Sequence, residues 1–326
     1  MDTKEAANGW LRQQRAAVAA DAWEPTHAAA AAGGPLFSTY AEQWLAARDL
    51  RPRTRADYRR MLDAHLLPRW GEYRLARITV ADVRDWHRDL LPEAPTMRAR
   101  VYGLFRTILK SAFNEDVITS NPCRVVGAGS VRRATRTDLP TVPQVAALAD
   151  AMPSPKYRVM VLLAAWCGLR FGELTELRPE DFHGDVIRVT RAVVRVDGRL
   201  VVGPPKSEAG VRDVTIPPHI LSEVLAYVGA AEPGALLFPG SRNGRHMAPS
   251  SLYKPFYRAR EVAGVPSLRW HDLRHFAGTS YAVAGATLAE TMSRLGHSTQ
   301  HAALRYQHAA AGRDREIAAR LAALGT

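Results

Sequence analysis

The spacing of apolar residues divides the chain into a helical first half and a second half in which a few strands interrupt the helices. Phe37, Tyr40, Trp44 and Leu45 form one apolar face at helical spacing. No alternating strand pattern appears before Pro122. The pattern therefore predicts four or five helices between Phe37 and Pro122.

Capping residues and chain breakers indicate where the helices of the first half begin and end. Thr54 is expected to cap the second helix, which should end near Leu67, where the sequence Pro68-Arg69-Trp70-Gly71 breaks the pattern. Thr79 is expected to cap the next helix. A long helix should follow from about residue 96 to 117.

The second half should combine a buried helix with a small sheet. Residues 157–167 are almost wholly apolar, which predicts a buried core helix. Strand-like sequences occupy 186–189, 200–202 and 211–216, and Asp197-Gly198 is typical of a hairpin turn. These strands predict one small antiparallel sheet. Further helices are expected from Pro143 and at 219–229, 250–263, 271–284, 287–294, 299–306 and 312–323.

Two stretches with the composition of linkers separate these regions. The first is rich in small residues and ends in Gly33-Gly34-Pro35, and the second, after Pro122, is rich in Gly, Arg and Thr. We therefore expect an N-terminal helix and linker (1–34), a helical domain (35–124), an interdomain linker (125–138) and a second domain (139–326).

The charge of the chain points to a polyanionic partner. With 326 residues the chain is long enough for two cores. Its net charge is +12 and its pI about 10.1, so nucleic acid is the first candidate partner. Residues 35–136 hold 19 Arg and Lys against 11 Asp and Glu, so most of the surplus lies in the first half. The expected DNA contacts are Arg51, Arg53, Arg55, Arg59, Arg100, Lys110, Arg132 and Arg133.

Several classes of protein are excluded by what the sequence lacks. The longest apolar run, residues 159–169, is shorter than the ~20 residues that a membrane-spanning helix needs. The N-terminus has no signal-peptide core, and Cys123 and Cys167 do not have metal-ligand spacing. No GxxxxGK[ST] phosphate-binding loop appears. The sequence predicts a cytoplasmic protein without a membrane segment, a metal or a cofactor.

The last sixty residues carry much of the candidate chemistry, with Tyr306 as a candidate nucleophile. A phenol has a pKa of ~10, so it needs nearby cations and a proton acceptor to attack at neutral pH. Arg170 and Arg274 are candidate phosphate clamps, because guanidinium groups bind non-bridging phosphate oxygens bidentately. Glu173 is placed to hold Arg170 or to cap the next helix.

Histidines and one lysine complete the candidate site. His271 lies three residues before Arg274 on one helical face and either takes the tyrosine proton or binds the phosphate. His297 is a candidate donor to a phosphate oxygen, and Lys206, between two strands, a candidate acid for the leaving 5′ oxygen. Taken singly, each residue is more readily explained as structural. The other nearby histidines are expected to be bystanders: His275, His301 and His308.

The order of these residues resembles that of the tyrosine recombinases, specifically the phage-type integrases. That family presents Arg, a hairpin Lys, His-x-x-Arg, His and Tyr, matched here by Arg170, Lys206, His271 with Arg274, His297 and Tyr306. The Gly-Leu-Arg-Phe-Gly-Glu run at 168–173, the Leu-Gly-His run at 295–297 and the nine-residue step to the tyrosine also match. The resemblance covers about residues 35–326. It departs at 302–303, where many relatives have a threonine and this chain has alanines.

The resemblance implies a mainly α fold with a small antiparallel sheet, in which a helical, SAM-like core-binding domain and a catalytic domain form a C-shaped clamp on duplex DNA. Tyr306 would form a 3′-phosphotyrosine and free a 5′ hydroxyl that attacks the partner duplex through a Holliday junction. The implied activity is integration or excision of a phage or mobile element, without ATP or metal.

The implied assembly is a homotetramer on double-stranded attachment sites, with excision or host DNA-bending proteins as accessory partners. Residues 314–324 are the expected C-terminal docking helix. The three-stranded sheet of the family's arm-binding domain is missing, and residues 3–20 resemble the helix that closes it. We therefore expect a late start or a shortened relative.

Two other functions remain open at this point. A monomeric type IB topoisomerase uses similar chemistry, but the sequence around Arg170 and His297 argues against it. A non-catalytic DNA-binding regulator has no need of Tyr306.

Overall fold

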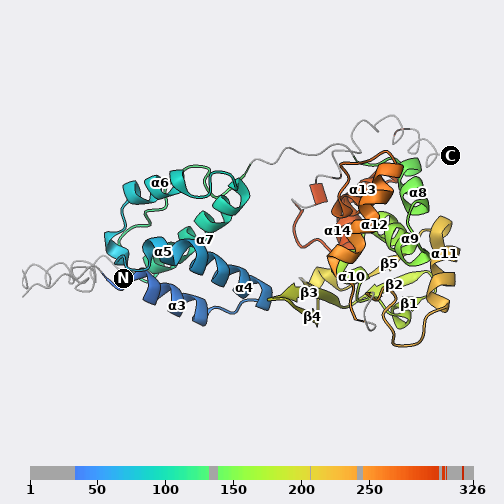
Figure 1. Ribbon diagram of the computed structural model, residues 1–326, viewed down its shortest axis with the longest axis horizontal. Helices are drawn as coiled ribbons and strands as arrows, with labels where there is room; N and C mark the ends of the chain where they lie inside the picture. The colour runs from blue at the N-terminus through green and yellow to red at the C-terminus, as the bar shows by residue number, and fades with distance from the viewer. Residues whose placement is uncertain are drawn as a thin grey trace, which may run out of the picture. The chain divides into compact units, whose positions relative to one another are not determined.

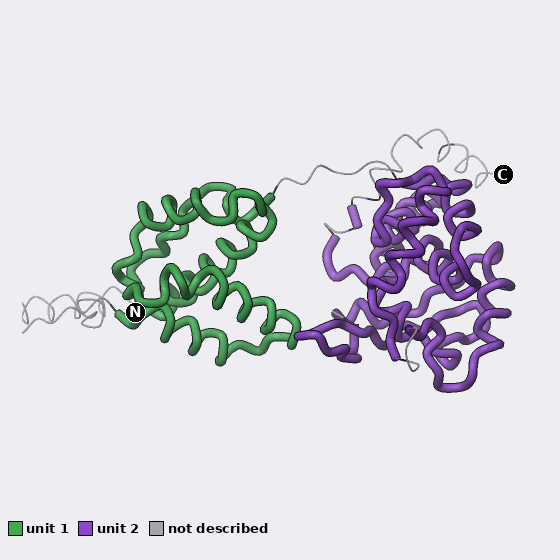
Figure 2. The backbone as a smooth tube through the Cα atoms, in the orientation of Figure 1, with its two compact units in different colours: residues 1–134 green, residues 135–326 purple. Residues whose placement is uncertain are grey.

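The computed structural model describes residues 34–131, 139–205, 207–240, 245–300, 303, 304, 306 and 318. The chain divides into two compact units, residues 1–134 (unit 1) and 135–326 (unit 2), shown in Figure 2. The division falls inside the segment 125–138 that the sequence marks as a linker. The predicted N-terminal helix at 3–20 lies outside the described residues.

Unit 1 is built from helices in its described part (Figure 1). Its elements are α3 (Phe37–Ala47), α4 (Pro52–Met61), the π-helix η1 (Leu62–Leu66), α5 (Leu67–Trp70), the 3₁₀-helix η2 (Leu75–Arg77), α6 (Val80–Asp89) and α7 (Pro95–Asn114). The prediction of four or five helices between residues 37 and 122 is confirmed.

Aromatic side chains form the centre of the unit 1 core. The apolar face predicted from Phe37, Tyr40, Trp44 and Leu45 is buried along α3. Trp70 stacks on Phe105 of α7 with ring centroids 5.1 Å apart, and both rings are fully buried. Large aromatic rings bury much apolar area each, so this packing contributes a large share of the unit's stability.

Two of the expected helix ends in unit 1 are wrong. Thr54 does not cap the second helix, because α4 begins at Pro52, whose fixed φ suits the first helical turn. Pro68 does not end that helix, because the π-turn η1 precedes it and Pro68 stands in the first turn of α5, so the helical run continues to Trp70. Thr79 caps α6 as predicted, in a capping box with Asp82.

Unit 2 is mainly helical with two small antiparallel sheets (Figure 1). Its helices are α8 (Val142–Asp150), α9 (Pro155–Leu162), the π-helix η3 (Leu163–Cys167), α10 (Phe171–Leu174), the 3₁₀-helices η4 (Pro179–Asp181) and η5 (Glu208–Gly210), α11 (Pro218–Gly229), α12 (Pro249–Val262), α13 (Trp270–Val283) and α14 (Leu288–Leu295). Its strands are β1 (Phe182–His183), β2 (Val186–Val189), β3 (Ala192–Val196), β4 (Arg199–Gly203) and β5 (Arg212–Thr215).

The strands pair differently from the single sheet that the sequence predicts. β2 lies between β1 and β5, while β3 and β4 form a separate two-stranded hairpin. The turn of this hairpin is at Asp197-Gly198 as predicted, and both residues have positive φ. Gly172 of α10 approaches the Val193 carbonyl so closely that a Cβ there would collide with it, which brings the hairpin against the start of α10.

The core of unit 2 surrounds α9 and η3. Residues 159–165 and Cys167 are buried, which confirms the buried helix predicted at 157–167. The π-turn η3 ends at Gly168, and Arg170 follows two residues later. No helix in the described part of the chain is long and apolar enough to cross a membrane.

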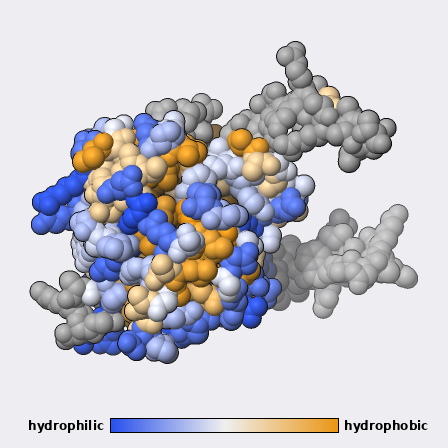
Figure 3. All heavy atoms as spheres, turned by 90° about the vertical axis from the view of Figure 1, so that its right-hand side faces the viewer, coloured by the Kyte–Doolittle hydropathy of each residue, from blue (hydrophilic) through white to orange (hydrophobic). Residues whose placement is uncertain are grey.

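Apolar side chains also gather on the surface of unit 2. Figure 3 shows them among polar ones on the side where α11 lies. α11 borders a groove of about 730 Å³ whose lining includes Met152, Pro155, Val159, Ala226 and Tyr227. The groove contains none of the residues predicted to carry chemistry.

Candidate active site

Three consecutive carbonyl groups at the C-terminal end of α14 each accept a hydrogen bond from a different arginine. The pairs are Arg212 Nε to Arg294 at 2.7 Å, Arg274 Nη2 to Leu295, and Arg170 Nη2 to Gly296 at 3.0 Å. Carbonyls at a helix C-terminus lack partners within the helix and carry partial negative charge, so cations are favourable there. His297 comes directly after this end and is thereby fixed beside the arginines.

Two glycines make this close packing possible. Gly168 and Gly296 have φ of +66° and +61°, a left-handed conformation that favours glycine. A Cβ at Gly168 would lie 2.6 Å from the Leu295 side chain, and one at Gly296 would lie 2.7 Å from the Ala209 carbonyl oxygen. Gly168 also accepts a hydrogen bond from Arg274 Nη1 through its carbonyl. Both glycines are thus required by backbone geometry and by space.

Arg170 is positioned by Glu173 at the start of α10. Its backbone N–H donates to Glu173 Oε2 at 2.9 Å, and its Nη1 donates to Oε1 at 2.7 Å. The Arg170 side chain is about one third exposed, so part of the guanidinium reaches the surface. The predicted role of Glu173 in holding Arg170 agrees with these bonds.

Arg212, which the sequence reasoning missed, shares the same carboxylate from the other side. Its Nη1 and Nη2 donate to Glu173 at 3.1 and 2.9 Å, and both side chains are almost fully buried. Burial alone would raise the pKa of the Glu173 carboxyl, but Arg212 and then Arg170 outweigh it and lower the pKa to about 2. We call Arg170, Glu173, Arg212 and Arg274 the arginine–carboxylate cluster.

A signal for Arg212 was present in the strand pattern. It stands in the same phase of β5 as Val214, which faces the core, so a charged residue at that position needs a buried partner.

Arg274 is the most enclosed cation of the cluster, with 3% of its surface exposed. Burial first, and then the positive charge of Arg170, lower the pKa of its guanidinium to about 9, while Glu173 and negative charge on Tyr306 act in the opposite direction. The group therefore stays positive at neutral pH. Because Tyr306 acts on Arg274, the positive charge of Arg274 in turn favours negative charge on the Tyr306 oxygen.

Tyr306 is buried, with 2% of its surface exposed, and its ring packs against α13 and against His297, which follows α14. The His297 ring stacks on it at 6.0 Å with an interplanar angle of 12°. Gly278 of α13 provides the space, since a Cβ there would lie 2.8 Å from Cζ of the tyrosine ring. Sequence reasoning gave no role to Gly278.

The hydroxyl group of Tyr306 is hydrogen-bonded to a histidine that the sequence reasoning set aside. His275 Nδ1 lies 3.0 Å from the Tyr306 oxygen. His271, which was predicted either to take the tyrosine proton or to bind the phosphate, is exposed, and its ring packs edge-on against His275 with centroids 4.8 Å apart. His275 is thus in direct hydrogen-bond contact with the phenol, and His271 packs against His275.

Some predicted residues lie outside the described part of the chain. These are Lys206, Arg132, Arg133 and all but one residue of the expected docking helix at 314–324.

The remaining DNA-contact candidates all belong to unit 1 and fall into two groups. Arg55 donates to the Leu45 carbonyl at 2.6 Å, and Arg59 pairs with Glu42 at 2.5 Å, so both connect α4 to α3. The other candidates are exposed on the surface, namely Arg51, Arg53, Arg100 and Lys110.

No group of three or more His, Cys, Asp or Glu within the described ranges has an arrangement that could hold a metal ion. Both cysteines are buried and unlinked, and burial raises the pKa of each thiol to about 12. The candidate site therefore rests on cations, histidines and a phenol.

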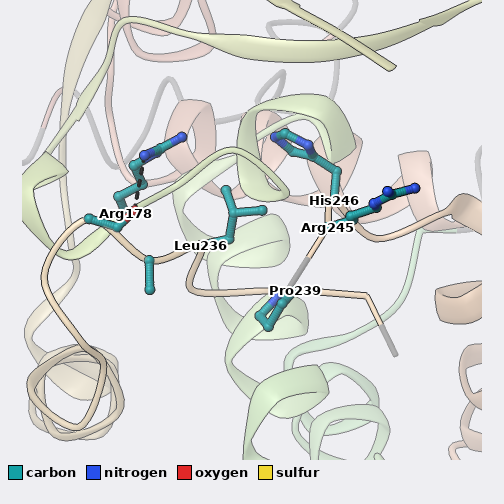
Figure 4. A pocket seen from close by; sticks show the side chains of 7 residues that line it. Arg178, Leu236, Pro239, Arg245 and His246 are labelled. Carbon is teal, nitrogen blue, oxygen red and sulfur yellow. Dashed lines mark hydrogen bonds between the residues drawn. The ribbon is translucent and has the colours of Figure 1, made fainter. Parts of the chain in front are cut away.

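A separate pocket of about 420 Å³ lies elsewhere in unit 2 (Figure 4). The labelled side chains that line it are Arg178, Leu236, Pro239, Arg245 and His246. Arg178 Nη1 donates to the Gly234 carbonyl at 3.0 Å, and His246 is hydrogen-bonded to the buried Glu176. These contacts hold the pocket wall together, and none of them involves the arginine–carboxylate cluster.

Comparison with known proteins gives a consistent result for both units. A family model described as the phage integrase family matches residues 141–313, more than half of the chain. A second, described as the N-terminal SAM-like domain of phage integrases, matches residues 36–91. A prophage phiRv2 integrase of Mycobacterium tuberculosis is 48% identical, over 98% of this chain and 86% of its own length. The integrase of Mycobacterium phage FRAT1 is 33% identical over 98% of both chains.

Solved structures share the fold. The Tn1549 transposon integrase, solved with transposon right end DNA, has a TM-score of 0.72 at 17% identity, covering 88% of this chain and 98% of its own. A lambda integrase dimer bound to a COC′ core site has a TM-score of 0.62 at 17% identity, covering 86% and 98%. Given the family models and the relative that is 48% identical over almost the whole chain, this protein belongs to the phage integrase family of tyrosine recombinases.

Proposed function

We propose that this protein breaks and rejoins DNA at specific sites through a covalent bond between Tyr306 and a 3′ phosphate, and so integrates or excises a phage or mobile element. The observation that carries the proposal is the position of Tyr306. Its phenol is buried between His275 and His297 and lies within electrostatic reach of Arg274.

The proposed reaction begins when the Tyr306 oxygen attacks the scissile phosphorus. Arg170 and Arg274 stabilise the charge that develops on the non-bridging oxygens, while Glu173 and Arg212 keep Arg170 in place. Their positions are fixed before substrate binds, so little reorganisation is needed during the reaction. The exposed His271 contacts the phosphate, and His297 donates to one of its oxygens.

The leaving 5′ oxygen takes a proton from Lys206 in this proposal. The energy of the broken bond remains in the phosphotyrosine, so the free 5′ hydroxyl of a partner duplex can reverse the step without ATP. Repeating the exchange on the second strand resolves the Holliday junction.

Double-stranded attachment sites are the proposed substrate. Two structural relatives were solved with DNA, namely the Tn1549 integrase and the lambda integrase. We assign residues 35–124 to a core-binding domain, 125–138 to a linker and 139–326 to the catalytic domain. The exposed Arg51, Arg53, Arg100 and Lys110 supply phosphate contacts. Four copies on two sites, with accessory bending proteins, complete the proposed assembly.

The test is the covalent adduct itself. A nicked attachment-site substrate traps the adduct, because the short 5′ fragment diffuses away, and a denaturing gel then resolves the protein–DNA band. Wild type should form the band and Tyr306→Phe should not. Tyr227→Phe is the matched control, since its hydroxyl bonds the Leu237 carbonyl away from the site. A band in Tyr306→Phe would show that another residue is the nucleophile.

A further inference from the structure

We infer that His275 is a further catalytic residue, which accepts the proton of Tyr306 during strand cleavage and returns it during rejoining. The inference rests on the proposed role of Tyr306 as nucleophile. It gives different roles to two histidines that lie one helical turn apart on α13, namely His271 and His275.

Geometry favours His275 over His271 as the proton acceptor. A general base must lie within about 2.6–3.2 Å of the atom that it deprotonates. His275 Nδ1 is 3.0 Å from the Tyr306 oxygen. His271 is exposed and its ring packs edge-on against that of His275, so its side chain is open to a phosphate that approaches from the surface.

In one tautomer of His275 the hydrogen bond has the direction that proton transfer needs. When neutral His275 carries its hydrogen on Nε2, Nδ1 is an acceptor and the Tyr306 hydroxyl donates to it. Neighbouring charges favour the proton transfer at both groups, the tyrosine oxygen that loses the proton and the His275 ring that gains it. Arg274 stabilises negative charge on the tyrosine oxygen.

Asp272 stabilises the imidazolium that forms. Burial would raise the pKa of the Asp272 carboxyl, but bonds from Arg269 outweigh this effect and lower it, and charge on His275 lowers it further. The interaction is reciprocal, so the Asp272 carboxylate favours a positive His275.

The step balances as a concerted displacement. The Tyr306 O–H bond breaks and its proton moves to His275 Nδ1, while the oxygen lone pair forms the bond to phosphorus. The bond between phosphorus and the 5′ oxygen breaks, and that oxygen takes a proton from the separate acid, proposed above as Lys206. In rejoining, the 5′ hydroxyl gives its proton back to the neutral acid, proposed above as Lys206, while its oxygen attacks phosphorus. The bond between phosphorus and the Tyr306 oxygen breaks, and His275 returns its proton to the phenolate.

The test separates proton transfer from hydrogen bonding. In His275→Asn the side-chain oxygen replaces Nδ1 as an acceptor but takes no proton at neutral pH. In His275→Ala the ring is absent, and added imidazole can occupy its place. Adduct formation on the nicked substrate is measured for each variant, with DNA affinity and thermal unfolding as checks. His219→Asn, whose ring packs on Trp166 away from the cluster, is the matched control.

The inference predicts a loss of roughly 10²-fold or more in the cleavage rate of His275→Asn, because general base catalysis typically contributes 10²–10⁴-fold. His275→Ala should be equally slow and should recover as imidazole is added, while His219→Asn keeps the wild-type rate. Wild-type cleavage in His275→Asn would overturn the inference, and so would a slow His275→Ala that imidazole does not rescue. Failure of wild type to form an adduct would instead overturn the proposed function.

Discussion

Arginine serves different purposes in the two units of this protein. In unit 1 the described arginines lie at the surface, as in the pairs of Arg59 with Glu42 and of Arg100 with Asp57. In unit 2, Arg170 and Arg212 converge on the buried Glu173, and Arg274 lies buried beside them with both of its Nη groups on carbonyls. The same residue type thus supplies surface charge in unit 1 and, within the arginine–carboxylate cluster of unit 2, fixed and enclosed charge.

The energetic cost of the two arrangements differs. Exposed ion pairs contribute about 0–1 kcal/mol, whereas burying charged groups costs several kcal/mol each before their partners compensate. Enclosed arginines are therefore a poor way to gain stability but an effective way to keep charges in fixed positions for a transition state. We expect substitutions in the cluster to impair cleavage, and substitutions at the surface of unit 1 to impair binding.

The largest effect is expected at the two phosphate clamps. Arg170→Ala and Arg274→Ala should each slow single-turnover cleavage by roughly 10²–10³-fold, by analogy with the loss of one oxyanion donor. DNA affinity should change much less, because it rests on many phosphate contacts. Rate and affinity are measured on the same nicked duplex. Equal losses in cleavage rate and in DNA affinity would mean that these arginines only bind the DNA backbone. The functional difference between the arginines of the cluster and those at the surface of unit 1 would then not exist.

The second largest effect is expected on stability, from the Glu173 carboxylate that holds the arginine–carboxylate cluster together. The pKa of Glu173 is lowered from 4.5 to about 2 by its arginines, so its charge stabilises the fold fully above pH 4.5 and progressively less as the pH falls toward 2. At pH 7 this corresponds to about 3 kcal/mol of unfolding free energy. Denaturant unfolding should find Glu173→Gln less stable by that order at pH 7, with the difference shrinking on acidification. A pH-independent difference would contradict the assignment.

A smaller effect is expected from the space around Tyr306. Gly278→Ala places a methyl group against the tyrosine ring and against Leu295, so the ring must shift. We expect cleavage to slow by roughly tenfold, which is a rise of ~1.4 kcal/mol in the activation barrier. Gly103→Ala in α7 is the matched control, because nothing lies within 4 Å of its added methyl. It should keep full activity and gain ~0.5–1 kcal/mol in stability. Unchanged cleavage in Gly278→Ala would mean that Tyr306 does not react from this position.

The smallest effect is expected at the surface of unit 1. Arg51→Ala combined with Arg53→Ala should weaken DNA binding and reduce the slope of log affinity against log salt by about 0.9 per lost phosphate contact. Cleavage at saturating protein should stay at the wild-type rate. Arg59→Ala should instead lower thermal stability, since Arg59 connects α4 to α3 through Glu42. An unchanged salt slope in the double variant would exclude Arg51 and Arg53 from the binding surface.

Local patterns in the sequence predicted the elements better than their ends. The apolar spacing in α3 and the apolar run through η3 each identify a buried helix, because helical periodicity depends on neighbouring residues alone. The prediction that Thr54 caps a helix was wrong because α4 already begins at Pro52. The prediction that the helix ends at Pro68 was wrong because a π-turn precedes Pro68 and the helical run continues. Where a helix begins or ends thus depends on which of several neighbouring capping or breaking residues is used.

Contacts between distant residues explain what the sequence missed in the site. Of the residues predicted from the family order, four lie together in the structure, namely Arg170, Arg274, His297 and Tyr306, while Lys206 lies outside the described residues. The bond between His275 and Tyr306 joins positions 31 residues apart, and that between Glu173 and Arg212 joins positions 39 apart. No local pattern encodes such pairs.

The central claim is that Tyr306 carries the broken DNA strand. Its most direct test is to trap the adduct of the wild-type protein on a nicked attachment-site duplex, digest both protein and DNA, and sequence the remaining nucleotide-bearing peptide by mass spectrometry. We predict that the mass of a 3′-phosphonucleotide is found on Tyr306. The same mass on any other side chain, or a cleaved strand with no peptide attached, would contradict the account.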